Sequence, residues 1–142
     1  MKIYADTSGL FAALVKNDIM HAKAGPAMER LLEEGYEIHT TSYVLLETMA
    51  LLQARVGLEA ARQFENVLRP LLQVHWVDES LHEKAFKRLE LRGTRGVSLV
   101  DCTSFVTMED TGIRYVFAYD EHFSEEGFHL IKKQAELDSV ID

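Results

Sequence analysis

Short β-prone runs alternate with longer helical segments along this chain of 142 residues. The runs with strand-like composition are residues 2–5, 36–40, 72–77, 113–119 and 128–131. Helical segments are expected at 8–16, 20–34, 42–55, 58–69, from about 80 to 92, and at 99–110. Strands separated by helices pair in parallel and are covered by helices on both faces. The pattern therefore predicts an α/β fold with a central parallel sheet.

Nothing in the sequence divides the chain, because it has no repeat, low-complexity tract or Gly/Pro-rich linker. A single domain over residues 1–142 is expected, and 47% apolar residues are enough for one core. Cys102 is the only cysteine, which excludes an internal disulfide and agrees with a cytoplasmic location. The N-terminal residues do not read as a secretory signal, and no apolar run approaches the roughly 20 residues that cross a bilayer, so no membrane association is expected.

The formal net charge of −8 argues against a protein that coats DNA, which usually carries a basic stripe. It does not exclude a nuclease, because bound divalent cations offset clustered carboxylates. The positions of individual acids are therefore more informative than the total charge.

Two acids directly follow predicted strands: Asp6 follows residues 2–5, and Asp120 follows residues 113–119. The carboxyl ends of parallel strands meet at one edge of a sheet, where ligands bind, so both acids are expected at this edge. Asp101 falls in the first turn of the helix at 99–110, and Glu47 lies about one turn into the helix at 42–55. The alternation of strands and helices brings all of these acids to the same edge.

Clustered carboxylates repel one another unless a cation lies between them. Hard oxygen ligands select Mg²⁺ or Mn²⁺, which keep water and substrate phosphate as further ligands. Such ions acidify water and stabilise the charge that builds on a phosphate under attack. The four acids thus favour metal-dependent phosphate hydrolysis, without a Ser, His or Cys nucleophile.

Four segments in this order resemble the PIN domain and, within it, the VapC-like toxin ribonucleases: YADTSGL, TTSYVLLET, SLVDCTSF and AYDEHF. The resemblance implies a three-layer α/β/α sandwich. It also implies a Mg²⁺- or Mn²⁺-dependent endoribonuclease that cleaves single-stranded or structured RNA as the toxin of a type II toxin–antitoxin pair. A small antitoxin protein and a homodimer are further implied.

Carried over by position, the acidic metal-site and catalytic residues are Asp6, Glu47, Asp101 and Asp120, with Thr7, Ser8 and Ser104 as supporting polar residues. The family commonly has Thr or Ser two residues before the last acid, where this chain has Ala118. A non-catalytic PIN-like module that binds RNA or a partner therefore stays open as the alternative. A haloacid-type phosphatase is disfavoured because it needs a second Asp where this chain has Ser8.

Each acid also has a purely structural interpretation. Asp6 is able to cap the following helix, although Thr7 or Ser8 is the expected cap, and Asp101 is able to complement a helix dipole. Glu47 is able to face solvent, but a lone acid on an apolar helix favours a metal ligand. Asp110 and Glu121 compete with Asp120, which is favoured as the acid directly after the most strand-like run.

The densest basic stretch lies just ahead of Asp101 and comprises Lys84, Lys87, Arg88, Arg92 and Arg95. Contact with RNA phosphates is one interpretation of this stretch, and an ordinary solvated helix face is favoured over it. The histidines show no HxH or HExxH spacing, so a zinc site is not expected.

Overall fold

Five parallel strands form the central sheet of the computed structural model, which describes residues 1–93 and 96–140. The strands are β1 (Lys2–Ala5), β2 (Glu37–Thr41), β3 (Leu72–His75), β4 (Tyr115–Phe117) and β5 (His129–Ile131). Their order is β3-β2-β1-β4-β5, and each neighbouring pair is parallel. In the middle of the sheet, Tyr4 lies opposite His39 on one side and Val116 on the other. The predicted parallel sheet is confirmed.

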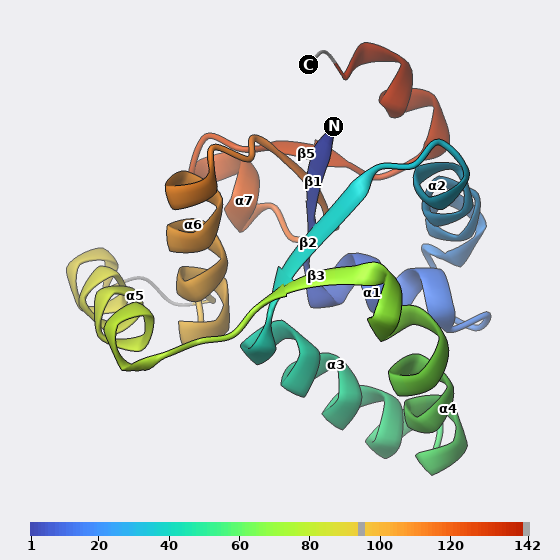
Figure 1. Cartoon of the computed structure of the whole chain (residues 1–142), viewed down its shortest axis with the longest axis horizontal. Coiled ribbons are helices and arrows are strands. Elements are labelled where there is room, and N and C mark those ends of the chain that lie inside the picture. The colour runs from blue at the N-terminus through green and yellow to red at the C-terminus, as the bar shows by residue number, and fades with distance from the viewer. Residues whose placement is uncertain (94–95, 141–142) are drawn as a thin grey trace.

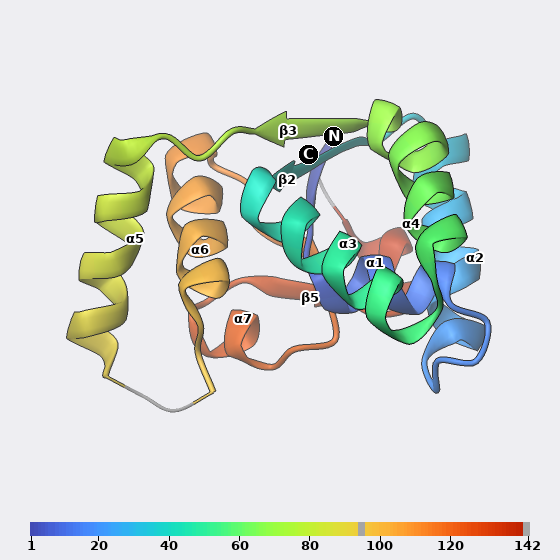
Figure 2. The ribbon, with the colours of Figure 1, turned by 90° about the horizontal axis from the view of Figure 1, so that it is seen from below.

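Helices cover both faces of this sheet (Figure 1). They are α1 (Thr7–Leu14), α2 (His21–Glu33), α3 (Ser42–Arg55), α4 (Leu58–Gln63), α5 (Glu79–Arg92), α6 (Leu99–Thr111) and α7 (His122–Glu125). A π-helical turn, η1 (Phe64–Leu68), and the 3₁₀ segments η2 (Arg69–Leu71) and η3 (Gln134–Ser139) accompany them. Figure 2 shows α5 and α6 side by side on one side of the sheet and α1, α2 and α4 on the other. This is the expected three-layer sandwich. Within the described residues, no helix has both the length and the apolar character that a membrane span requires.

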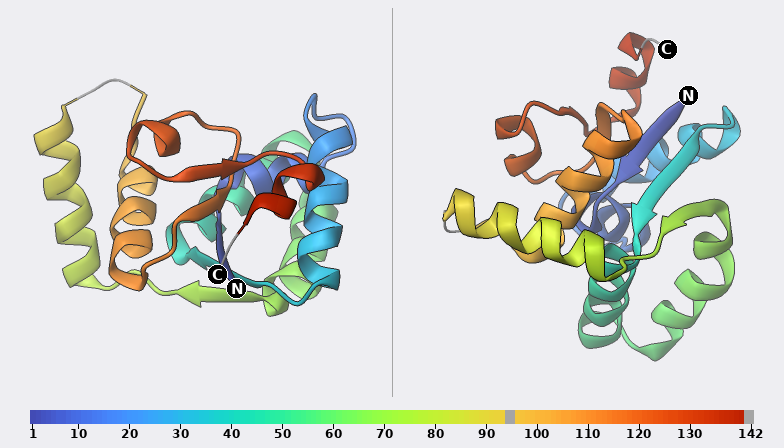
Figure 3. Two further views of the ribbon diagram at one scale, coloured as in Figure 1. Left: turned by 90° about the horizontal axis from the view of Figure 1, so that it is seen from above. Right: turned by 60° about the vertical axis from the view of Figure 1, so that its left-hand side comes forward.

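The core lies on both faces of the sheet, and α6 is its most buried helix. Every residue from Asp101 to Met108 in α6 is buried, so this helix has no solvent-facing stripe over that stretch. Its Phe105 packs edge-on against Phe123 with 5.1 Å between the ring centroids. Such burial on all sides is typical of a helix held between neighbours, here α5, α3 and β2 (Figure 3).

Several element boundaries differ from the prediction. Thr7 and Ser8 do not cap α1; Asp6 does, because its side chain accepts the backbone N–H of Ser8. The single helix predicted at 58–69 is broken into α4, η1 and η2, with Pro70 in the last of these, where a proline removes a helical hydrogen bond. The strand predicted at 113–119 is only three residues long, and α7 was not predicted.

The order of the strands explains where ligands bind. The chain passes from β1 to β2 on one side and later enters β4 on the other side, so the sheet changes winding direction between β1 and β4. Gly9 lets α1 approach this point closely, since a Cβ atom there would lie 2.3 Å from the carbonyl oxygen of Phe117. The backbone N–H of Asp6 donates to that same oxygen at 3.2 Å. Asp6 therefore lies at the crevice between the carboxyl ends of β1 and β4.

Candidate active site

A surface depression at the carboxyl edge of the sheet collects the four predicted acids. Its lining residues are Asp6, Thr7, Ser8, Glu47, Leu51, Gly96, Ser98, Asp101 and Asp120. The acids come from separate segments: the end of β1, helix α3, the first turn of α6 and the loop after β4. The structure thus brings together all four acids and two of the three supporting residues.

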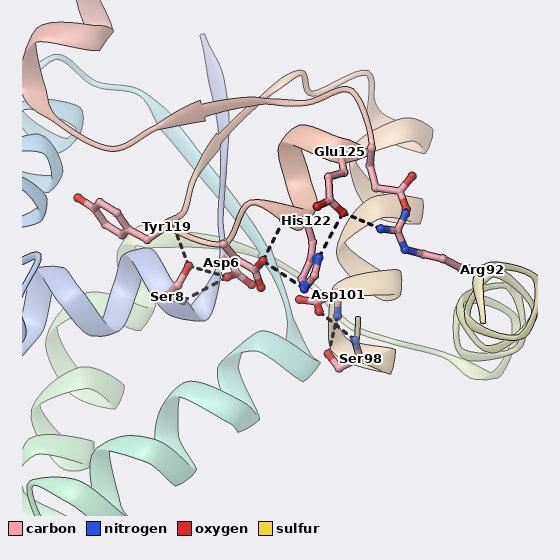
Figure 4. A network of polar contacts seen from close by, with 10 residues as sticks. Asp6, Ser8, Arg92, Ser98, Asp101, Tyr119, His122 and Glu125 are labelled. Carbon is pink, nitrogen blue, oxygen red and sulfur yellow. Dashed lines mark hydrogen bonds and ion pairs between the residues drawn. The ribbon is translucent and has the colours of Figure 1, made fainter. Parts of the chain in front are cut away.

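Asp6 is the most buried of these acids, with 4% of its surface exposed. Its Oδ2 accepts the hydroxyl of Ser8 at 2.8 Å and the Ser8 backbone N–H at 3.2 Å. The Ser8 hydroxyl oxygen in turn accepts the backbone N–H of Tyr119 at 2.9 Å (Figure 4). Ser8 therefore ties Asp6 to the segment after β4. The other oxygen of Asp6, Oδ1, is buried and has no hydrogen-bond partner among the described residues.

Asp101 is held by a reciprocal cap at the start of α6. The Ser98 hydroxyl oxygen accepts the N–H of Asp101 at 3.1 Å, and Asp101 Oδ2 accepts the N–H of Ser98 at 2.9 Å. Sequence reasoning did not single out Ser98, although Ser-x-x-Asp before a helix is the pattern of a capping box. The dipole role and the site role of Asp101 are compatible, because the cap orients the carboxylate at the rim of the depression.

Asp120 is positioned without any polar group at residue 118. Its Oδ1 accepts the backbone N–H of His122 at 2.9 Å, and its carbonyl oxygen accepts the N–H of Phe123 at 3.3 Å. The side chain of Ala118 is fully buried in the core. The turn into α7 thus orients Asp120, and Ala118 does not leave this acid unsupported.

The remaining predicted residues differ in their distance from the depression. Glu47 is half-buried and lines it. Thr7 lines it too, and its hydroxyl oxygen accepts the Thr48 hydroxyl at 3.3 Å, which joins α1 to the helix that carries Glu47. Ser104 is not among the lining residues; it is fully buried, and its hydroxyl lies 2.6 Å from that of Tyr4. Ser104 supports the packing of α6 on β1 rather than the site directly.

The carboxylates are close enough to affect one another. The pKa of Asp6 is raised to about 7, mainly by burial and also by the charges of Asp101 and Glu47, although the hydrogen bonds from Ser8 oppose the rise. Burial also raises the pKa of Asp101, assisted by the charges of Asp120 and Glu47 and opposed by Ser98. A cation in the depression would remove this repulsion and favour the charged form of both groups.

The residues present fit a hard divalent ion in their chemistry. Oxygen donors are the ligands that Mg²⁺ and Mn²⁺ prefer, and the unpartnered Oδ1 of Asp6 is a buried acceptor that a cation would satisfy. As they lie, however, no three His, Cys, Asp or Glu side chains among the described residues form a ready-made group for a metal ion. The depression therefore offers the donors without a closed coordination shell.

The rival acids lie elsewhere. Asp110 is near the far end of α6, where its carboxylate is 3.9 Å from Lys84 Nζ, and Glu121 pairs with Lys132 at 2.5 Å. Neither residue lines the depression. Of these three acids, Asp120 alone lines the depression.

The basic stretch on α5 is divided: Lys84 and Lys87 are exposed, whereas Arg88 and Arg92 turn toward the protein. Arg88 pairs with Glu109 at 2.7 Å, and Arg92 pairs with Glu126 at 2.5 Å, so neither guanidinium belongs to an ordinary solvated face. Arg95 lies outside the described residues.

The fold and this edge of carboxylates define a PIN domain, and the chain belongs to the PIN-domain family, whose profile matches residues 3–128. A curated relative, the 23S rRNA-specific endonuclease VapC20 of Mycobacterium tuberculosis, is 35% identical over 133 residues, which are 93% of this chain and 99% of that protein. The crystal structure of Mycobacterium tuberculosis VapC20, described as a sarcin-ricin loop cleaving toxin, superposes with a TM-score of 0.80 at 33% identity over 92% of this chain and 98% of the other.

More distant structures share the fold. FitAcB from Neisseria gonorrhoeae matches with a TM-score of 0.65 and 13% identity, over 92% of this chain and 96% of the other. VapBC2 from Rickettsia felis, bound to a DNA fragment from their promoter, matches with a TM-score of 0.67 and 14% identity, over 92% of this chain and 98% of the other. At such identities the likeness extends to the fold alone.

Proposed function

We propose that residues 1–142 form one PIN-like nuclease domain that acts in the cytoplasm as a Mg²⁺- or Mn²⁺-dependent endoribonuclease. The observation that carries the proposal is the depression in which Asp6, Glu47, Asp101 and Asp120 meet at the carboxyl edge of the sheet. Electrostatics add support, because burial and neighbouring carboxylates raise the pKa of Asp6 to about 7, and a cation among these carboxylates would offset their charge.

The four acids are the proposed ligands, and the chain's other residues hold them in place. Bound there, a divalent ion would supply Lewis-acid chemistry, acidifying water and offsetting charge on a phosphate. Ser8 orients Asp6, the Ser98 cap orients Asp101, and the bond between Thr48 and Thr7 fixes α3 against α1. Ser104 acts at a distance, through Tyr4.

The proposed substrate is structured RNA, and specifically 23S rRNA. The support is VapC20, which is named for this activity and is 35% identical over 93% of this chain. The proposed biological role is that of a toxin. Complexes such as VapBC2 share the fold, which supports a small antitoxin protein as the partner, and a homodimer is proposed as the assembled form.

Cleavage of ribosomal RNA tests this function. Purified chain is incubated with ribosomes or with isolated 23S rRNA in Mg²⁺, Mn²⁺ or EDTA, and cut sites are mapped by primer extension. Asp6→Asn and Asp101→Asn are expected to lower the rate about a thousandfold, because ligand loss removes several kcal/mol of charge stabilisation. Asp110→Asn and Glu121→Gln are matched controls that remove an acid outside the depression, and both are expected to cleave normally.

Cleavage that persists in EDTA, or that survives both ligand substitutions, would overturn the mechanism. RNA binding without cleavage in either metal would support the non-catalytic alternative instead. Growth arrest on expression, relieved by co-expression of a small protein encoded next to this chain, tests the toxin role.

A further inference from the structure

Helix α7 is a single turn of four residues, His122–Glu125, and only Glu121 separates it from Asp120. Helices this short are not stable by themselves in water, so tertiary contacts must hold the turn. One such contact is Phe123, which is fully buried against Phe105 of α6. The polar face of the turn needs a separate anchor.

Arg92, the last residue of α5, supplies most of that anchor. Its guanidinium donates to Glu125 at 2.9 Å and to Glu126, the residue that follows α7, at 2.5 Å. Arg88, one turn earlier on α5, also pairs with Glu126, at 3.2 Å. The side chain of Arg92 is only 20% exposed, and that of Glu126 is 16% exposed. A planar guanidinium that engages two carboxylates in this partly shielded place orients them better than a lone surface pair does.

His122 connects the anchored turn to the carboxylate of Asp120. The His122 backbone N–H donates to Asp120 Oδ1 at 2.9 Å, and its ring Nε2 lies 3.7 Å from the same oxygen. Ring Nδ1 lies 3.5 Å from Glu125 Oε2 on the other side. Figure 4 shows this series of contacts from Arg92 through Glu125 to His122, beside Asp101 and Asp6.

The same histidine also touches the wall that carries Asp101. Gly96 lines the depression just before the Ser98 cap, and a Cβ atom on it would lie 3.0 Å from His122 Nε2. Gly96 also has a φ of +85°, in the region that favours glycine. The entry to α6 and the turn of α7 therefore lie against each other at Gly96 and His122.

We propose that Arg92 is a positioning residue for the metal site: by clamping α7 to the end of α5, it holds the carboxylate of Asp120 next to that of Asp101. The proposal rests on the proposed function, because it assumes that these carboxylates share a divalent ion. It also gives Arg92 a use other than binding RNA phosphate.

Titration of the full-length, EDTA-treated protein with Mn²⁺ alone, followed by calorimetry, tests the clamp without any RNA. Arg92→Met is expected to weaken Mn²⁺ binding about tenfold, the lower end of the effect of residues that orient metal ligands. A decrease in Mn²⁺ affinity is informative, because the loss of a positive charge beside an acidic site would by itself increase that affinity. Arg92→Lys is expected to recover part of the loss, because an ammonium group reaches one carboxylate well but not both.

Arg30→Met is the matched control. Arg30 is 21% exposed and, like Arg92, pairs with two acids, here Glu34 and Asp138, but it lies on α2. Its loss is expected to lower stability without changing Mn²⁺ affinity. The variants are compared at a temperature where circular dichroism shows each of them fully folded.

A double substitution tests whether Arg92 affects Mn²⁺ binding through Asp120. In an Asp120→Asn background, Arg92→Met is expected to cause no further loss of Mn²⁺ affinity, because the clamp acts through Asp120. Wild-type affinity in Arg92→Met, or an equal loss in both backgrounds, overturns the clamp while leaving the metal site intact. Failure of the wild-type chain to bind Mn²⁺ overturns the proposed metal site and the clamp with it.

Discussion

Replacing Asp6 with asparagine in the metal-free protein is expected to raise the free energy of unfolding, and to raise it more at pH 8 than at pH 5. Asp6 is 4% exposed, and its pKa is about 7 in the folded chain against 3.8 for an ordinary aspartate. Between these two values the folded chain holds a proton that the unfolded chain has lost. The stability contributed by protonated Asp6 is therefore lost as the pH rises through this window.

Each unit of difference between the folded and unfolded pKa corresponds to 1.36 kcal/mol of stability. Complete ionisation of Asp6 in the folded chain therefore lowers the free energy of unfolding by about 4 kcal/mol. From pH 5 to pH 8 the wild-type protein is expected to lose about 2–3 kcal/mol relative to Asp6→Asn. Asparagine is nearly isosteric and is an equally good N-cap, so the bonds from Ser8 are retained.

Urea unfolding in EDTA at a series of pH values measures the difference, and taking wild type minus variant cancels the titration of other groups. Asp78→Asn is the control: Asp78 caps α5 in an exposed position, and the exchange is expected to change stability by well under about 1 kcal/mol at either pH. The free energy of unfolding of Asp6→Asn is expected to exceed that of the wild type by more at high pH. If this difference does not grow with pH, the buried charge of Asp6 does not destabilise the site.

Three further substitutions probe separate parts of the structure. Glu47→Gln keeps the size of the side chain but removes a proposed ligand, so RNA cleavage is expected to fall at least tenfold with the melting temperature nearly unchanged; normal cleavage would exclude Glu47 from the site. Ser104→Ala leaves the buried hydroxyl of Tyr4 without its partner and is expected to cost about 1–3 kcal/mol in urea unfolding, with unchanged cleavage per folded molecule; a selective loss of cleavage would place Ser104 in the site after all. Gly96→Ala forces a Cβ against His122 at a positive φ and is expected to cost about 1–3 kcal/mol and to weaken Mn²⁺ binding; full Mn²⁺ affinity would show that this wall tolerates displacement.

The local sequence pattern was sufficient to predict the strands and helices that are determined by residues close together in the chain. A β-prone run predicted the strand at 2–5, alternation of polar and apolar residues predicted the strand at 36–40, and a glycine or a capping residue marked most helix ends. It failed at α7, whose four residues carry too little periodicity to predict a helix, and at the break after α4. The turn of α7 depends on the residues that pack against it, whereas the break after α4 precedes Pro70, which removes a helical hydrogen bond.

The gathering of acids at one edge of the sheet was predictable because its cause is topological. An acid after a parallel strand emerges at the carboxyl edge whatever the details of packing, so Asp6 and Asp120 could be placed together from the order of elements alone. Chain order likewise brought Asp101 and Glu47 to the same edge, and the resemblance to PIN domains added the supporting residues. All four acids line one depression.

What only the tertiary structure decided are the distances between segments far apart in the chain. Sequence spacing does not say that Ser104 bonds Tyr4 instead of facing the site, or that Oδ1 of Asp6 is buried without a partner. Nor does it say that Arg92 turns from solvent toward Glu125 and Glu126. These contacts depend on how helices pack across the sheet and on side-chain direction, which are set by the whole core at once rather than by neighbours in sequence.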